Sequence, residues 1–266
     1  MKKTQRLIVC ASLLLAALSI AAVAQAQSPF DGTWHINPSQ AKFDPKPFTV
    51  YTSQGWYHCV SCTPPYDVQA DGQAHPVTGQ PFDTESVTVV DPHTTSFVDQ
   101  KGGKTTTEAT VTVSADGKLL TIKSKSYPMG GGAPQSSSLT LKRVGVLPAG
   151  VHATSGNWVP TGFTDTDADL TFTFKSNGDE LTMTDPTGDS YTAKFDGGNY
   201  PFKGSYQTDA VSLKKIDAHT IEETDKHNGT VTNVSKMTVS ANGKTMTMVS
   251  HDPQRDVTST FVATKK

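Results

Sequence analysis

The stretch that decides the fold is residues 170–184, which reads LTFTFKSNGDELTMT. On both sides of Asn177-Gly178, apolar side chains alternate with threonines, a pattern typical of antiparallel strands that bury one face and expose the other. Asn-Gly is the strongest short hairpin signal, so we predict that these two residues occupy the centre of a type I′ turn. The stretch therefore predicts a β-hairpin.

The same signals recur along most of the chain. Alternating runs such as Tyr191–Phe195 are separated by turn pairs such as Asp116-Gly117 and Asn242-Gly243. Turns at intervals of about 8–12 residues indicate an all-β chain of antiparallel neighbours. A meander of this kind either curls into an up-and-down β-barrel or folds into a β-sandwich, and closure removes the exposed edges. We therefore predict barrels, with a sandwich as the alternative.

An internal repeat divides the chain. Gly32-Thr33-Trp34 recurs as Gly156-Asn157-Trp158, 124 residues later, and Ser114–Lys118 recurs as Ser240–Lys244, 126 residues later. Landmarks that keep their order at a nearly constant offset indicate two copies of one unit. The predicted division is a first β unit of residues 27–146, a linker of residues 147–153 and a second β unit of residues 154–266.

The N-terminus has the pattern of a secretory signal peptide. Basic Lys2, Lys3 and Arg6 precede the apolar run Leu7–Val23, and Ala24-Gln25-Ala26 supplies small residues for cleavage. We expect residues 1–26 to be removed and the protein to be periplasmic or secreted from a bacterium. No later apolar run is long enough to span a bilayer, so no integral membrane segment is expected after cleavage.

Charge and motifs exclude several classes of function. Without the signal peptide the chain has 20 basic and 25 acidic residues, a net charge of −5, and no basic stripe that would favour a nucleic-acid partner. The sequence contains no G-x-S-x-G, no H-E-x-x-H and no nucleotide-binding glycine loop. We therefore predict no enzyme activity, no cofactor and no metal. The sequence leaves the oligomeric state open.

The first copy carries a feature that the second lacks, the Cys-x-x-Cys segment of residues 59–62. In an oxidising compartment, a disulfide between Cys59 and Cys62 is the favoured interpretation. Two alternatives remain open at this stage. The pair could be a redox-active dithiol, or it could bind a metal together with His58 or His75.

The two Gly-x-Trp segments, at residues 32–34 and 156–158, resemble the first-strand motif of lipocalins and related calycin barrels. The chain also resembles tandem secreted bacterial proteins with segments like Asp196–Pro201 and Val211–Asp217, a group that implies no activity. The lipocalin resemblance implies a barrel that holds a small hydrophobic ligand. The candidate cavity residues are Trp34, Trp158, Phe172, Phe174, Met183 and Tyr191.

Three functional hypotheses follow. The first is an exported, non-enzymatic protein that binds a small apolar ligand inside a β-barrel. The second is a periplasmic structural or interaction module whose barrels are packed by their own side chains; in that case Trp34 and Trp158 pack across the barrel ends. The third is a redox or metal function of the Cys59/Cys62 segment.

Overall fold

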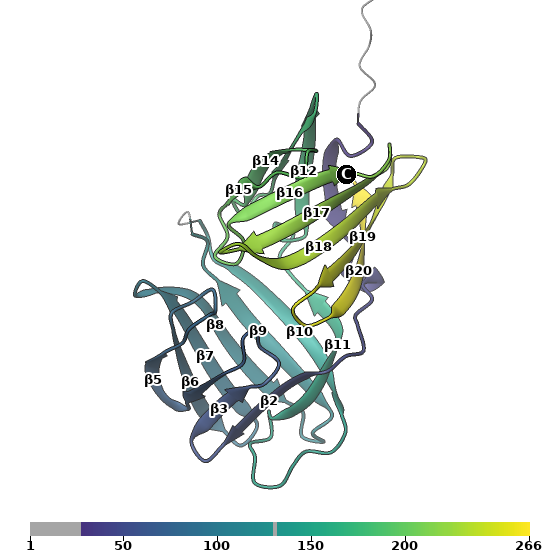
Figure 1. Cartoon of the computed structure of the whole chain (residues 1–266). Coiled ribbons are helices and arrows are strands. Elements are labelled where there is room, and N and C mark those ends of the chain that lie inside the picture. Colours follow the sequence, from purple (N-terminus) through teal and green to yellow (C-terminus); the bar gives the residue numbers. More distant parts are fainter. Residues whose placement is uncertain (1–27, 130–131) are drawn as a thin grey trace, which may run out of the picture.

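The computed structural model describes residues 28–129 and 132–266. Within these ranges the prediction of an all-β chain is confirmed: twenty antiparallel strands form two barrel-like sheets, and the one helical element is a short 3-10 turn, Pro38–Gln40. The expected signal peptide, residues 1–26, lies outside the described residues. Figure 1 shows the two sheets as separate bodies that contact each other.

Each sheet contains ten strands. The first barrel is formed by β2 (Phe48–Ser53), β3 (Trp56–Cys59), β4 (Tyr66–Gln69), β5 (Asp71–Pro76), β6 (Thr84–Asp91), β7 (Thr94–Lys101), β8 (Lys104–Val113), β9 (Leu119–Ser126), β10 (Gln135–Val144) and β11 (Gly156–Thr164). The second barrel is formed by β1 (Gly32–Ile36), β12 (Thr171–Asn177), β13 (Glu180–Thr184), β14 (Ser190–Lys194), β15 (Tyr200–Lys203), β16 (Ala210–Lys215), β17 (Thr220–His227), β18 (Thr230–Val239), β19 (Thr245–Asp252) and β20 (Val257–Lys265).

The two barrels differ in closure. The second is a closed barrel in which β1 pairs with both β12 and β20. The first runs in the order β4-β3-β2-β11-β10-β9-β8-β7-β6-β5 and lacks a hydrogen-bonded ladder between β4 and β5. It is therefore a nearly closed barrel with one seam.

The first strands of the two copies are exchanged. β1 belongs to the first copy but lies in the second barrel, where Trp34 pairs with Phe172 and Lys265. β11 belongs to the second copy but lies in the first barrel between β10 and β2. The sheets therefore depart from the expected units, residues 27–146 and 154–266, at the first strand of each. In Figure 1 the purple N-terminal segment lies beside the yellow C-terminal strands.

The hairpin at residues 170–184 forms, but its turn is one residue later than predicted. Asn177 pairs with Glu180, so the two-residue loop is Gly178-Asp179. Gly178 has a φ of +66°, whereas Asn177 keeps the negative φ of a strand residue. A loop with glycine in its first position suits a type II′ turn, which needs positive φ only there. The prediction of a type I′ turn centred on Asn177-Gly178 was therefore wrong.

The cores of the barrels also differ. One continuous cluster of thirteen buried residues, which includes Leu181 and Met246, fills the second barrel. The first barrel has two separate clusters of four buried residues each, one around Val68 and Val87, the other around Leu120 and Trp158. The second barrel is therefore packed by its own side chains, and the first has a less continuous interior.

The strand exchange predicts which cysteine pairs can cross-link. Thr33 and Thr173 are cross-strand partners with their hydroxyl oxygens 2.9 Å apart. The double variant Thr33→Cys/Thr173→Cys should form a disulfide under mild oxidation, because directly opposed residues have Cβ atoms close enough to be bridged. Peptide mapping by mass spectrometry without reductant measures the cross-link.

The control uses the residue that would lie opposite Thr173 if each copy kept its own first strand. Asn157 is the repeat counterpart of Thr33, and in the structure it pairs with Thr49 in the first barrel. The double variant Asn157→Cys/Thr173→Cys should therefore remain reduced. If this pair cross-links and the Thr33/Thr173 pair does not, the first strands are not exchanged.

Candidate functional site

The Gly-x-Trp motif closes one end of each barrel. Trp34 is fully buried and donates its indole N–H to the Phe30 carbonyl at 2.7 Å. The ammonium of Lys265 lies 4.7 Å from the Trp34 ring, so a cation covers the buried indole. The motif residue Trp34 is therefore part of a plug that packs across the barrel end.

The first barrel repeats this arrangement with an arginine. Trp158 donates to the Thr154 carbonyl at 3.0 Å, and the Arg143 guanidinium lies 4.1 Å from its ring centre. Gly156 has a φ of +126°, and a Cβ there would lie 2.5 Å from a guanidinium nitrogen of Arg143. The glycine of the motif is therefore required by both its backbone and the close approach of the cation.

The other cavity candidates lie in the packed core of the second barrel. Phe174 and Tyr191 are buried there, and Phe172 and Met183 pack against the same cluster. None of the six candidate residues lines any of the three pockets described below. These four candidates of the second barrel therefore lie together, but in a packed core rather than around a cavity.

The Cys-x-x-Cys segment forms a disulfide, as the favoured interpretation predicted. Cys59 and Cys62 are bonded, and Cys59 is almost fully buried. The neighbouring histidine His58 contacts the Asp67 carboxylate at 2.7 Å rather than the sulfurs. Within the described ranges, no three His, Cys, Asp or Glu side chains are grouped so that they could hold a metal ion.

A buried acid pair lies inside the first barrel. Glu85 on β6 is 4% exposed and accepts a hydrogen bond from the Tyr66 hydroxyl at 3.0 Å, which bridges the seam between β4 and β5. Asp99 on β7 is the cross-strand partner of Glu85. Glu85 Oε2 and Asp99 Oδ1 are buried and have no hydrogen-bond partner.

The surroundings of both carboxyls favour their protonated forms. Burial, then the charge of Asp99, raises the pKa of Glu85 to about 8, while burial raises the pKa of Asp99 to about 6. Their mutual hydrogen bond favours the proton on Glu85, since it raises the pKa of Glu85 and lowers that of Asp99. A proton shared by the pair would also account for the oxygen of each acid that lacks a hydrogen-bond partner.

The second barrel contains a corresponding acid pair, Glu223 and Asp225 on β17. The Tyr191 hydroxyl donates to Glu223 Oε2, and burial together with the charge of Asp225 raises the pKa of Glu223 to about 8. Asn233 donates to Asp225 at 3.1 Å and accepts from the Ser250 hydroxyl at 2.6 Å. This network occupies the half of the barrel remote from Trp34.

The tyrosine and the aspartate at each acid pair occupy equivalent positions in the two copies. Tyr66 and Tyr191 are 125 residues apart, and Asp99 and Asp225 are 126 apart, the same offsets as the repeat landmarks. The glutamates are not equivalent, because the residue that faces Asp225 across the strands is Val211. Each barrel thus places a tyrosine and a glutamate near its equivalent aspartate. The glutamate, however, comes from non-equivalent positions in the two copies. Sequence reasoning missed these residues; the signal was an aspartate kept in both copies.

The acid pairs lie near clefts where the open ends of the barrels meet. The wide cleft, about 880 Å³, is lined by residues 77–83 of the first barrel and by Asp225 and Asn233 of the second. The narrow cleft, about 520 Å³, is lined by Asp99 and by residues 204–207. Each of the two repeat-equivalent aspartates therefore lines one of the two clefts.

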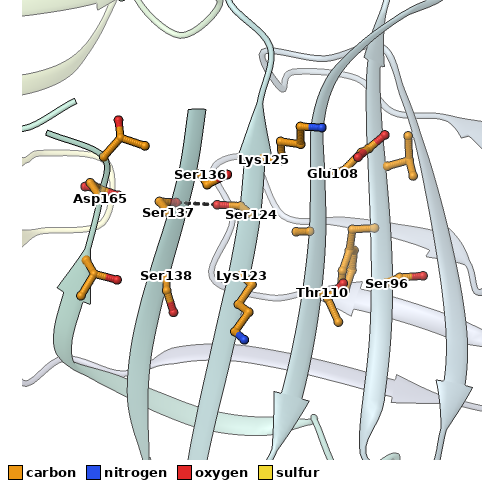
Figure 2. Close-up of a pocket in the computed structure, with 15 residues that line it drawn as sticks. Ser96, Glu108, Thr110, Lys123, Ser124, Lys125, Ser136, Ser137, Ser138 and Asp165 are labelled. Carbon is orange, nitrogen blue, oxygen red and sulfur yellow. Dashed lines mark hydrogen bonds between the residues drawn. The ribbon is translucent and has the colours of Figure 1, made fainter. Parts of the chain in front are cut away.

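A third pocket lies on the outer face of the first barrel. This groove of about 600 Å³ crosses β7 to β11 and includes Thr110, Lys123 and Lys125 (Figure 2). Thr110 and Lys123 are cross-strand partners and alternate along their strands with the core-packed residues Val111 and Ile122. Their side chains therefore point away from the core.

No helix in the described ranges has the length and apolar character needed to cross a membrane. No known protein family, no curated protein and no solved structure matches this chain.

The raised pKa values predict how stability depends on pH. The folded-state pKa of about 8 for Glu85 lies above its usual 4.5, so the native state holds a proton that the unfolded chain releases. The free energy of unfolding should therefore fall as pH rises from about 4.5 to about 8, and Glu223 adds a loss over the same window. At about 1.4 kcal/mol per pKa unit, we expect a decrease of at least about 3 kcal/mol between pH 5 and pH 8. Urea unfolding at a series of pH values measures it.

The variant Glu85→Gln should reduce this dependence by about half and leave the contribution of Glu223, because the amide cannot ionise yet keeps the shape of the side chain. Glu108 is exposed on the outer face of β8, so Glu108→Gln is the matched control and should leave the slope unchanged. An unaltered slope in Glu85→Gln would show that the pair does not share a proton.

The Gly-x-Trp plug gives a second prediction. Gly156→Ala should lower the free energy of unfolding by about 1–3 kcal/mol, because alanine at positive φ is strained and its Cβ displaces Arg143. Gly162 on the same strand has open space around it, so Gly162→Ala is the control and should change stability little. Equal losses in the two variants would contradict the proposed role of the glycine.

Proposed function

We propose that this chain is an exported, non-enzymatic binding protein, periplasmic or secreted, built from two lipocalin-like barrels. Its ligand is a small molecule rich in hydrogen-bonding groups that binds in the clefts between the two open barrel ends. Support for the likeness comes from the closed end of each barrel, where a Gly-x-Trp strand is covered by a cation from a neighbouring strand, β10 in the first barrel and β20 in the second. The other end of each barrel faces a cleft.

One observation carries the proposal: Asp99 and Asp225 are equivalent acids that lie inside the two barrels and also line the clefts. Burial raises the pKa of both carboxyls, so each is held in an environment that disfavours its charge. An apolar residue at these positions would stabilise a barrel better than a buried acid. Retention of the aspartate in both copies is explained if a ligand uses it.

The clefts are better supported as binding sites than the lumen of the second barrel. Packed side chains such as Leu213 and Met237 fill that lumen, and a lumen filled in this way leaves no room for a ligand. A small hydrophobic ligand, as the lipocalin resemblance implies, would have to use the less continuous interior of the first barrel. The polar clefts instead favour a ligand that makes hydrogen bonds.

The proposal is tested by blocking both clefts with one substitution. Gln207 is exposed and lines both clefts, so Gln207→Trp fills them without disturbing either core. Native mass spectrometry of protein isolated from its own envelope fraction should show a bound small molecule, and this adduct should be lost or at least tenfold weaker in Gln207→Trp.

The control is Gln73→Trp, an equally exposed glutamine on β5 that lines none of the three pockets. It should keep the adduct. An adduct that persists in Gln207→Trp, or the absence of any adduct from the unaltered protein, would refute binding in the clefts.

A further inference from the structure

The lining of the narrow cleft is acidic and aromatic. The first barrel contributes Asp99 from β7, and the second contributes Asp189 from the end of the β13–β14 turn. Among the described residues that line this cleft, none is lysine, arginine or histidine. The wide cleft differs, because Lys101 and His227 line it together with its acids. The two clefts therefore favour ligands of different charge.

The two carboxyls of the narrow cleft lack cationic partners. Asp99 Oδ1 is buried without a hydrogen-bond partner, and Glu85 behind it is 4% exposed with an unpartnered Oε2. Neither Asp99 nor Asp189 belongs to an ion pair within the described part of the chain. A partly buried carboxylate is stabilised strongly by an opposite charge, because solvent screens the attraction only weakly there.

Aromatic rings complete the lining. Phe82, Tyr127 and Tyr206 all line the narrow cleft. The ammonium of Lys125 lies 5.4 Å from the centre of the Tyr127 ring, so that ring already has a cationic partner, whereas no cation–ring contact involves Phe82 or Tyr206 in the described part of the chain. Aromatic faces attract ammonium groups, and rings combined with carboxylates are the usual means of recognising quaternary ammonium ligands.

We propose that the narrow cleft binds a small organic cation, with its ammonium group between Asp99 and Asp189 and against the aromatic rings. This inference rests on the proposed function and specifies the ligand class for one of its two clefts. The volume of about 520 Å³ lies in the range of about 300–1,000 Å³ typical of small-molecule sites.

Binding of such a cation depends on pH through the charges around the two aspartates. Glu85, Tyr57 and Tyr66 surround Asp99, and burial is the largest cause of the raised pKa of Asp99, about 6. Burial, then the charges of Asp185 and Asp169, raises the pKa of Asp189 to about 6. Both carboxyls are therefore ionised at pH 8 and largely protonated at pH 5. The cation should bind more tightly at pH 8.

The test uses a pair of probes that differ in charge but not in shape. Choline carries a quaternary ammonium, and 3,3-dimethylbutan-1-ol replaces its nitrogen by carbon. Isothermal titration of the mature protein at pH 8 should show that choline binds at least tenfold more tightly than the neutral alcohol. Asp99→Asn and Asp189→Asn should each weaken choline binding about tenfold or more, the effect of about 1.4 kcal/mol.

Two controls separate charge from folding. Glu108→Gln removes an exposed carboxylate on the outer face and should leave choline binding unchanged. Asp189 lies in a surface turn, whereas Asp99 lies inside the barrel. A loss of choline binding in Asp189→Asn therefore remains informative even if Asp99→Asn is unstable.

The outcomes also separate this inference from the proposed function. Equal affinity for the two probes, or choline binding that both aspartate variants leave unchanged, would overturn the assignment of a cation. The proposed function survives that result if an adduct is still lost in Gln207→Trp. If choline binds as expected but no natural adduct depends on Gln207, the narrow cleft is a cation site and the binding role of the paired clefts fails.

Discussion

Backbone pairing of the exchanged first strands is the constraint on which the rest of the structure depends. β1 closes the second barrel by pairing with β12 and β20, and β11 occupies the same place in the first barrel. The two barrels are therefore tied together by strands that cross between them, and their open ends are held face to face. Clefts lined from both sides follow from that arrangement.

The acid pairs show a conflict between stability and retained chemistry. Glu85 is the one charged side chain among the buried residues of the described ranges, and its Oε2 has neither a cation nor a hydrogen-bond donor as partner. Burial of such groups costs free energy that packed apolar side chains would not. The second barrel incurs the same cost with Glu223, which comes from a different strand position. A glutamate lies near the equivalent aspartate in both barrels, although the two glutamates occupy non-equivalent positions. Both barrels therefore keep an acidic environment around the aspartate rather than one inherited glutamate.

Much of the fold could be predicted from local sequence. Alternation and turn residues are local signals, so the strands and hairpins around Leu181 and Gly243 follow from them, and the repeat follows from Gly32 and Gly156. The exchange could not be predicted, because Phe48 and Phe172 are equivalent partners for the tryptophan of either first strand. The site was missed because it depends on which side chains of distant strands meet. Asp99 is one polar residue in an alternating strand, and only the folded barrel brings it to Glu85 and the cleft.

The exchanged strands also bear on how such a chain could arise. A polypeptide with a single copy has no first strand of its own in place, so it could complete its barrel only by trading that strand with a second molecule. Two molecules that trade strands reciprocally form an isologous dimer with twofold symmetry. The present chain has that arrangement within one polypeptide, joined through residues 145–155 between β10 and β11. Gene duplication and fusion would convert the bimolecular assembly into an intramolecular one, which no longer depends on protein concentration. Fusion would also free the two copies to diverge, as the disulfide confined to the first copy illustrates.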